Sequence, residues 1–139
     1  MSLCPGFSII IPTFNRAFCI CEAVDSVLMQ NYPDFELIVV DDGSSDGTDM
    51  LLKERYGAEM ACGRLKYLRS GHEGVSAARN KGLCAATREW AGYLDTDNRM
   101  CADYFAVFEN AVRTGGAKCY YAQIKHCLLY TSPSPRDRT

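Results

Sequence analysis

Two acidic runs, each directly after a hydrophobic stretch, carry the residues of this chain that could do chemistry. Asp41 and Asp42 follow the apolar letters FELIVV, and Asp95 and Asp97 follow WAGYL. If both stretches are parallel strands of one sheet, their carboxyl ends converge on the crevice where open α/β sheets bind ligands. The four carboxylates could then surround one nucleotide and one hard metal ion.

The pair Asp95 and Asp97 has a spacing that suits a metal ion. Alternate residues of an extended segment point the same way, so both carboxylates can face one cation. A site made of oxygens, with no Cys or His nearby, suits Mg²⁺ or Mn²⁺ held jointly by protein and diphosphate oxygens. Short acidic pairs are also common in surface loops, but the position directly after an apolar strand favours the metal site.

Asp41 and Asp42 allow two interpretations. A carboxylate at a strand tip can accept hydrogen bonds from a base N–H or a ribose hydroxyl, and Gly43 would let the backbone approach a ligand closely. The letters DDGSS are equally typical of a turn that leads into a helix. From this run alone, ligand binding and turn formation remain equally open.

Arg79 stands near the start of the helix that follows the turn SGHEG. A cation there could neutralise a phosphate together with helix-terminal amides. The alternative is a solvated helix arginine that pairs with Glu73 or Glu89. His72 and His126 are isolated and receive no role.

The elements that must position these side chains alternate regularly. Strands are expected over 7–11, 35–40, 65–69, 90–94 and 118–124. Helices are expected between them; Asn15 can cap the first, and the small residues Ala77, Ala78 and Gly82 predict a close approach of another to the sheet. This alternation implies right-handed crossovers and an α/β fold with a mostly parallel sheet between two helical layers.

Composition places the chain among ordinary globular domains. Its 139 residues make one domain, and a net charge of −2 gives no reason to expect nucleic-acid or membrane binding. No apolar stretch approaches the roughly 20 residues of a spanning helix. The start MSLCPGFSIIIP has no signal-peptide pattern, so we expect a cytoplasmic location, with attachment at the inner face of the membrane through other regions left open.

The eight cysteines include no CxxC pair and no zinc-type spacing, so we expect reduced thiols in small apolar sites. The last stretch, CLLYTSPSPRDRT at 127–139, has no helical or alternating pattern. It resembles the translation of a sequencing adapter, and a natural disordered tail is the alternative. We therefore expect a domain over 1–126, cut after about its fifth strand, and an unstructured tail over 127–139.

Four motifs together resemble glycosyltransferase family 2, whose members have a GT-A (Rossmann-like) fold. They are FSIIIPTFNR (7–16), SVLMQNYPDFELIVVDDGSSDGT (26–48), GVSAARNKG (74–82) and GYLDTDN (92–98). The resemblance implies a metal-assisted, inverting transfer of a sugar from a nucleotide donor, most often a UDP-sugar, to an acceptor hydroxyl. The acceptor would be a saccharide or a lipid-linked molecule, as in cell-wall or polysaccharide biosynthesis.

The resemblance also implies roles for single residues. Pro12, Thr13 and Phe14 would line the base, which Asp42 would receive with Asp41 close by. Asp95 would face the ribose and the Mn²⁺ or Mg²⁺ ion, Asp97 would bind that ion directly, and Arg79 would lie near the diphosphate. Many members have a third Asp where this chain has Asn98.

The general base and the acceptor pocket of family members lie beyond the second acidic run. No residue of this chain is therefore expected to act as the base, and the chain alone is expected to be inactive. The alternative function is a noncatalytic nucleotide-binding domain, which has no need of the metal. A phospho-receiver domain needs an acidic pair after its first strand, where this chain has PTFN, and no dinucleotide or P-loop motif is present.

Overall fold

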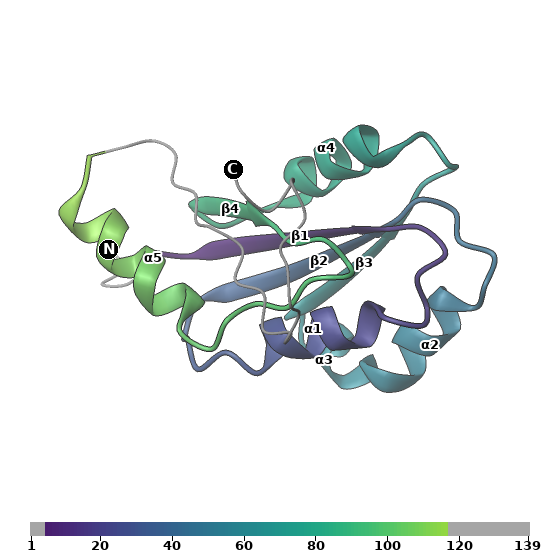
Figure 1. Ribbon diagram of the computed structural model, residues 1–139, viewed down its shortest axis with the longest axis horizontal. Helices are drawn as coiled ribbons and strands as arrows, with labels where there is room; N and C mark the ends of the chain where they lie inside the picture. The colour runs from purple at the N-terminus through teal and green to yellow at the C-terminus, as the bar shows by residue number, and fades with distance from the viewer. Residues whose placement is uncertain (1–4, 117–139) are drawn as a thin grey trace, which may run out of the picture.

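A computed structural model describes residues 5–116, in which four strands form one parallel sheet (Figure 1). The strands are β1 (Phe7–Thr13), β2 (Phe35–Asp41), β3 (Leu65–Arg69) and β4 (Trp90–Tyr93). Their order in the sheet is β3-β2-β1-β4, and every adjacent pair is parallel. Every residue of β1 and β2 is buried, because these central strands are covered on both faces. The predicted strands are confirmed apart from 118–124, which lies outside the described residues.

The chain changes direction across the sheet after β3. The connections from β1 to β2 and from β2 to β3 move one way, whereas β4 returns to the other side of β1. The carboxyl ends of β1 and β4 therefore flank a topological switch point, which is where open α/β sheets form a ligand crevice.

Helices cover both faces of this sheet. On one face lie α1 (Ile20–Leu28), α2 (Thr48–Arg55), α3 (Gly57–Ala61) and α5 (Tyr104–Thr114), and on the other lies α4 (Val75–Ala85) (Figure 1). The first face holds the larger apolar core, which includes Phe105 of α5. This arrangement confirms the predicted three-layer α/β sandwich.

Helix α4 lies unusually close to the sheet. A Cβ atom added to Gly82 would be 2.5 Å from Cγ2 of Ile10 and 3.1 Å from Cγ2 of Val40. Ala78, one turn earlier, is also buried against the sheet. The close approach predicted from the small residues of this helix is confirmed, and it fixes the height of α4 above the strand ends.

Pro12 marks the place where β1 and β4 separate. The bond from the Leu94 N–H to the Ile10 carbonyl (3.0 Å) shows that the backbone N–H and C=O groups of even-numbered β1 residues point toward β4. Pairing with β4 ends at Ile10 and Tyr93, so the N–H that Pro12 lacks has no ladder partner to lose. On its other side β1 continues in register with β2 as far as Thr13. The strand is thus two residues longer than expected, and a crevice opens on the β4 side.

A buried carboxylate ties the opposite end of the sheet together. Glu36 of β2 is 1% exposed and accepts hydrogen bonds from the Ser8 hydroxyl (2.6 Å) and the Thr87 N–H (2.7 Å). The Lys66 ammonium forms an ion pair with it at 2.8 Å. Burial alone would raise the pKa of Glu36, but Lys66, Ser8 and Thr87 lower it to about 2. Strands β1, β2, β3 and the turn before β4 therefore share one charged network that the sequence did not indicate.

The expectation that Asn15 caps the first helix is wrong. Asn15 does not cap α1, which begins at Ile20 after Cys19; instead Asn15 adopts a left-handed conformation (φ 52°). Its N–H donates to the Ser44 hydroxyl (2.7 Å), and its side-chain oxygen accepts from the Ser45 N–H (2.9 Å). Asn15 thus fastens the end of β1 to the loop after β2.

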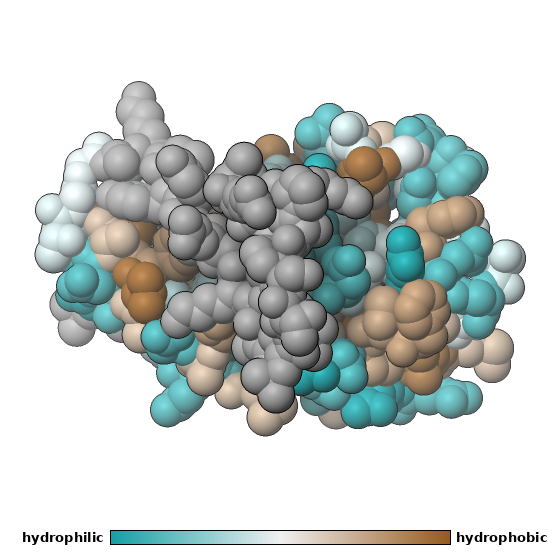
Figure 2. All heavy atoms as spheres, in the orientation of Figure 1, coloured by the Kyte–Doolittle hydropathy of each residue, from teal (hydrophilic) through white to brown (hydrophobic). Residues whose placement is uncertain are grey.

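The described cysteines are free thiols, as expected, but not all fill apolar sites. Cys19 and Cys21 are half-buried, whereas Cys62, Cys84 and Cys101 are exposed. The packing expectation is therefore wrong for these three. On the face shown in Figure 2, apolar residues form separate patches among hydrophilic ones.

None of the helices between residues 5 and 116 combines the length and the apolar character needed to cross a bilayer. The cytoplasmic location stays a prediction. The boundary at residue 126 and the tail 127–139 lie outside the described residues, and so does His126.

Candidate functional site

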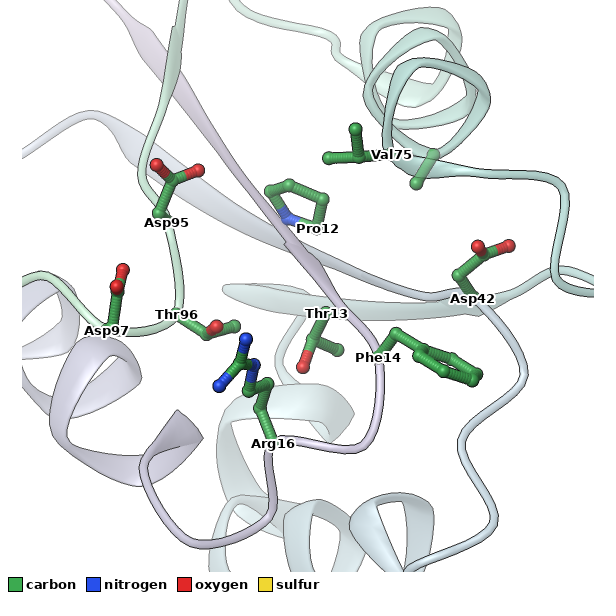
Figure 3. Close-up of a pocket in the computed structure, with 10 residues that line it drawn as sticks. Pro12, Thr13, Phe14, Arg16, Asp42, Val75, Asp95, Thr96 and Asp97 are labelled. Atoms are coloured by element: carbon green, nitrogen blue, oxygen red, sulfur yellow. The ribbon is translucent and has the colours of Figure 1, made fainter.

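A pocket of about 360 Å³ lies at the carboxyl ends of the strands, beside the switch point (Figure 3). This volume is within the range of small-molecule sites. The lining residues come from the ends of β1 and β2, from the start of α4 and from the loop after β4: Pro12, Thr13, Phe14, Arg16, Asp42, Val75, Ala78, Asp95, Thr96 and Asp97. The structure therefore brings together six predicted residues and leaves Asp41 and Arg79 outside the lining.

Asp42 forms one end of the pocket and holds the turn that leads into α4. Its carboxylate accepts hydrogen bonds from the Ser70 hydroxyl (2.8 Å), the Glu73 N–H (2.7 Å) and the Gly74 N–H (2.9 Å). Burial acts to raise the pKa of Asp42, but the two backbone amides, Ser70 and His72 outweigh it and lower that pKa. Asp42 is thus an ionised anchor.

One acceptor position of Asp42 remains for a ligand. Oδ1 already accepts two hydrogen bonds, whereas Oδ2 accepts only that from Gly74, and Nδ1 of His72 lies 3.7 Å away. A carboxylate oxygen has two lone pairs, so Oδ2 can take one more donor. Gly43, expected to approach a ligand, instead has positive φ (88°) and packs against the backbone of Ser70 and His72.

Asp41 faces the other side of β2 and is completely buried. Its oxygens accept hydrogen bonds from the Ser44 N–H (2.8 Å) and the Tyr67 hydroxyl (2.5 Å), and Arg69 lies at 3.4 Å. Burial and the bond to Asp41 raise the pKa of Tyr67 to about 12. Asp41 therefore holds the loop after β2 through its hydrogen bond with the Ser44 N–H, and its carboxylate is not part of the pocket lining.

An aromatic pair lies beside Asp42. The ring of Phe14 packs against that of His72 with centroids 4.3 Å apart and ring planes tilted by 30°, and Phe14 is 39% exposed. His72, which was not assigned a role from its sequence position, has a left-handed backbone (φ 60°). A flat ring next to a carboxylate acceptor suits a planar heterocycle that carries an N–H group.

A polar residue that sequence analysis did not select lies in the middle of the pocket. Arg16 follows directly after PTFN at the end of β1, and its guanidinium extends toward Thr96 (Figure 3). A cation next to a strand-end motif was the available signal. Thr13, which was expected to line the base, has a buried hydroxyl oxygen with no hydrogen-bond partner in the described part of the chain, and a ligand donor would satisfy it.

Asp95 and Asp97 form the other end of the pocket, with the buried Thr96 between them. Both carboxylates are exposed to solvent, unlike those after β2. No group of three or more Asp, Glu, His or Cys residues that could hold a metal exists among residues 5–116. Two carboxylates at an open pocket fit Mg²⁺ or Mn²⁺, because such ions take the rest of their oxygens from water and phosphate.

Arg79 lies outside the pocket lining and contacts Asp95 from α4. Its Nη2 lies 3.3 Å from Oδ1 of Asp95, and its guanidinium carbon lies 5.8 Å from the centre of the Tyr93 ring. The ion pair is with Asp95 rather than with Glu73 or Glu89.

The sequence matches the family model described as "Glycosyl transferase family 2" over residues 8–138. It is 30% identical, over 127 residues, to the GalNAc(5)-diNAcBac-PP-undecaprenol beta-1,3-glucosyltransferase of Campylobacter jejuni, covering 90% of this chain and 39% of that protein.

Two solved proteins have a similar structure. TarS 1-349 from S. aureus has a TM-score of 0.70 and 25% identity, covering 87% of this chain and 40% of that one, and it was also solved with UDP-GlcNAc. Mannosyltransferase PcManGT from Pyrobaculum calidifontis, in complex with GDP-Man and Mn²⁺, has a TM-score of 0.69 and 30% identity, covering 79% and 33%. This chain spans less than half the length of each of these relatives.

Proposed function

The chain belongs to glycosyltransferase family 2, and from this membership we propose that its parent protein transfers a sugar from a UDP-sugar to an acceptor hydroxyl. One observation carries the proposal. Asp42, directly after β2, and the pair Asp95 and Asp97 from the loop after β4 line the same pocket, at opposite ends. A nucleoside diphosphate has the matching polarity, with a base that donates hydrogen bonds at one end and a diphosphate that needs cations at the other.

The base binds at the end formed by Asp42 and Phe14. The free acceptor position of Asp42 receives a base N–H, and the exposed ring of Phe14 supports the plane of the base. Pro12 and Thr13 form the floor, where the unpaired Thr13 hydroxyl is available to the nucleoside. Asp41 acts indirectly, by holding the loop that presents Asp42. A uracil base fits this proposal because its N3–H is a donor.

The diphosphate binds between Arg16 and the loop after β4. Asp97, assisted by Asp95, would hold Mn²⁺ or Mg²⁺, and such an ion supplies positive charge to the departing nucleotide diphosphate. Arg16 and Arg79 add positive charge at the same end, where negative charge increases as the sugar leaves. The residues of this chain thus bind the leaving group and orient it.

The acceptor side lies outside this assignment. We propose inversion at the anomeric carbon through a single displacement, with a carboxylate taking the acceptor proton, and we assign that base to no residue between 5 and 116. A saccharide or lipid-linked acceptor is supported by the name of the C. jejuni relative, which describes an undecaprenol-linked glycan.

Calorimetric titration of the purified chain with UDP tests the proposal. Binding is expected with Mn²⁺ present, with weaker binding of ADP, and is expected to fall when EDTA removes the metal. Saturable UDP binding that is unchanged by EDTA would instead support the noncatalytic nucleotide-binding domain. Absence of UDP binding in every condition contradicts both. Incubation with UDP-sugars, Mn²⁺ and acceptors is expected to give no turnover from this chain alone, because it spans less than half of its relatives.

A further inference from the structure

The ion pair between Arg79 and Asp95 is weakly made. Nη2 and Oδ1 are 3.3 Å apart, and the two side chains are 38% and 53% exposed. Exposed pairs of this length contribute little to stability. The contact nevertheless involves one of the two carboxylates assigned to the metal, on the side of the pocket where α4 begins.

The rest of the Arg79 side chain is not fully satisfied either. Among residues 5–116, its buried Nε has no hydrogen-bond partner, and the guanidinium lies over the ring of Tyr93 with no carboxylate other than that of Asp95 paired to it. A guanidinium has five donors arranged to bind two oxygens of a carboxylate or phosphate. With one long contact and one unpaired N–H, Arg79 loses little when it leaves Asp95 for a better acceptor.

The charges around this end favour such an exchange. Asp95 and Asp97 provide two negative charges, Arg79 neutralises one of them, and Arg16 faces the pocket from the loop after β1. Asp42 is committed to the turn before α4 and lies at the far end. A divalent cation alone therefore meets a site with little net negative charge, whereas a diphosphate brings the missing anion and also an acceptor for Arg79.

We propose that Arg79 is the counter-ion of Asp95 until donor and metal bind together, and that it then moves to the diphosphate. Arg79 thereby makes firm metal binding conditional on the diphosphate. This inference rests on the proposed function, because it requires a nucleotide diphosphate as ligand. Arg79 acts as a positioning residue, through Asp95 and the diphosphate.

The test compares Mn²⁺ binding, measured from the loss of the free-ion electron paramagnetic resonance signal, with and without UDP. Arg79→Gln removes the counter-ion, and Arg79→Lys keeps the charge. Lys81→Gln removes the same charge from an exposed position of the same helix, two residues away, and is the matched control. Thermal unfolding monitored by circular dichroism verifies that each variant folds.

Arg79→Gln is expected to bind Mn²⁺ alone about two- to fivefold more tightly than the unchanged chain, because an exposed ion pair no longer competes. The same variant is expected to bind UDP with Mn²⁺ about tenfold more weakly, because a charge-assisted contact to the diphosphate is lost. Arg79→Lys and Lys81→Gln are expected to keep the weak binding of Mn²⁺ alone.

Equal or weaker binding of Mn²⁺ alone by Arg79→Gln overturns the inference, and so does absence of Mn²⁺ binding in both proteins. The proposed function is tested separately, by UDP binding to the unchanged chain. A chain that binds UDP, but whose affinity for Mn²⁺ alone does not respond to Arg79→Gln, retains the function and loses the counter-ion exchange.

Discussion

Replacing Asp42 by Asn separates the two roles of this carboxylate, since it keeps the shape and removes the charge. In the unchanged protein, Oδ1 of Asp42 accepts from the Glu73 N–H (2.7 Å) and Oδ2 accepts from the Gly74 N–H (2.9 Å). An amide has only one oxygen, so one of these two backbone donors must face an NH₂ group in Asp42→Asn. Because Asp42 is only 4% exposed, water cannot easily replace the lost acceptor.

The magnitude follows from this count. One unpaired backbone N–H costs about 1–3 kcal/mol, and the bonds that remain lose their charge assistance. We expect Asp42→Asn to lower the free energy of unfolding by about 2 kcal/mol. If the turn before α4 opens locally, amide exchange at Glu73 and Gly74 should be about 30-fold faster, since 1.4 kcal/mol is a factor of ten. UDP binding should fall as well.

The assay is urea denaturation together with hydrogen exchange of the peptide that contains residues 70–74. Asp103→Asn makes the same chemical change at an exposed helix start whose side chain makes no capping hydrogen bond, and it should alter stability by less than about 0.5 kcal/mol. If Asp42→Asn is as stable as Asp103→Asn and exchange over 70–74 is unchanged, the anchoring role of Asp42 is refuted.

Three further predictions concern the sheet and the metal end. Gly82→Ala should destabilise the fold by about 1–3 kcal/mol, despite the better helix propensity of alanine, because the new Cβ would lie 2.5 Å from Ile10; an unchanged urea midpoint would contradict this. Glu36 has a pKa lowered to about 2 from 4.5, so it contributes about 3 kcal/mol of stability above pH 4.5, lost as the pH falls toward 2; Glu36→Gln should flatten that acid limb of a stability–pH curve, and parallel curves would argue against it. Asp97→Asn should weaken the Mn²⁺-dependent part of UDP binding at least tenfold, since even outer-shell changes at metal sites cost about that much, and calorimetry that finds no loss would exclude Asp97 as a ligand.

The sequence predicted the convergence of the acidic runs because each run directly follows an apolar strand, and parallel strands of one sheet end at the same edge. Once FELIVV and WAGYL are parallel strands beside β1, the residues that follow them must emerge at one edge. The small residues of α4 likewise predicted its close approach, since only a helix without bulky side chains on that face can pack so near Ile10.

The pattern could not divide the work between Asp41 and Asp42. Neighbouring residues of a strand point to opposite faces. Asp41 therefore lies on the same face of the sheet as Val39, and Asp42 lies on the same face as Val40. Which of these faces leads to the pocket depends on the side that α4 covers, and this is set by the crossover after β3. Asp41 therefore lies on the face of the sheet that α1 and α2 cover, where the Tyr67 hydroxyl and the Ser44 N–H donate hydrogen bonds to it.

The residues that sequence analysis missed or left unassigned belong to loops whose conformation is decided by distant partners. Asn15 adopts its left-handed backbone because Ser44 and Ser45 bind it, and Arg16 is turned into the pocket as a consequence. His72 reaches Phe14 only because Asp42 holds the turn around it. Such contacts span about thirty residues or more, so no local periodicity contains them.

The two acidic runs therefore differ in what they can offer a ligand. The carboxylates of Asp41 and Asp42 are buried and already matched by protein donors, so adding a cation there would break hydrogen bonds that hold two loops. Those of Asp95 and Asp97 are exposed, and within residues 5–116 their one ion pair is the weak contact of Asp95 with Arg79, so a cation displaces mainly water. Because the free energy of cation binding includes the cost of the contacts it replaces, the metal belongs with Asp95 and Asp97, and Asp42 is left to recognise a neutral hydrogen-bond donor.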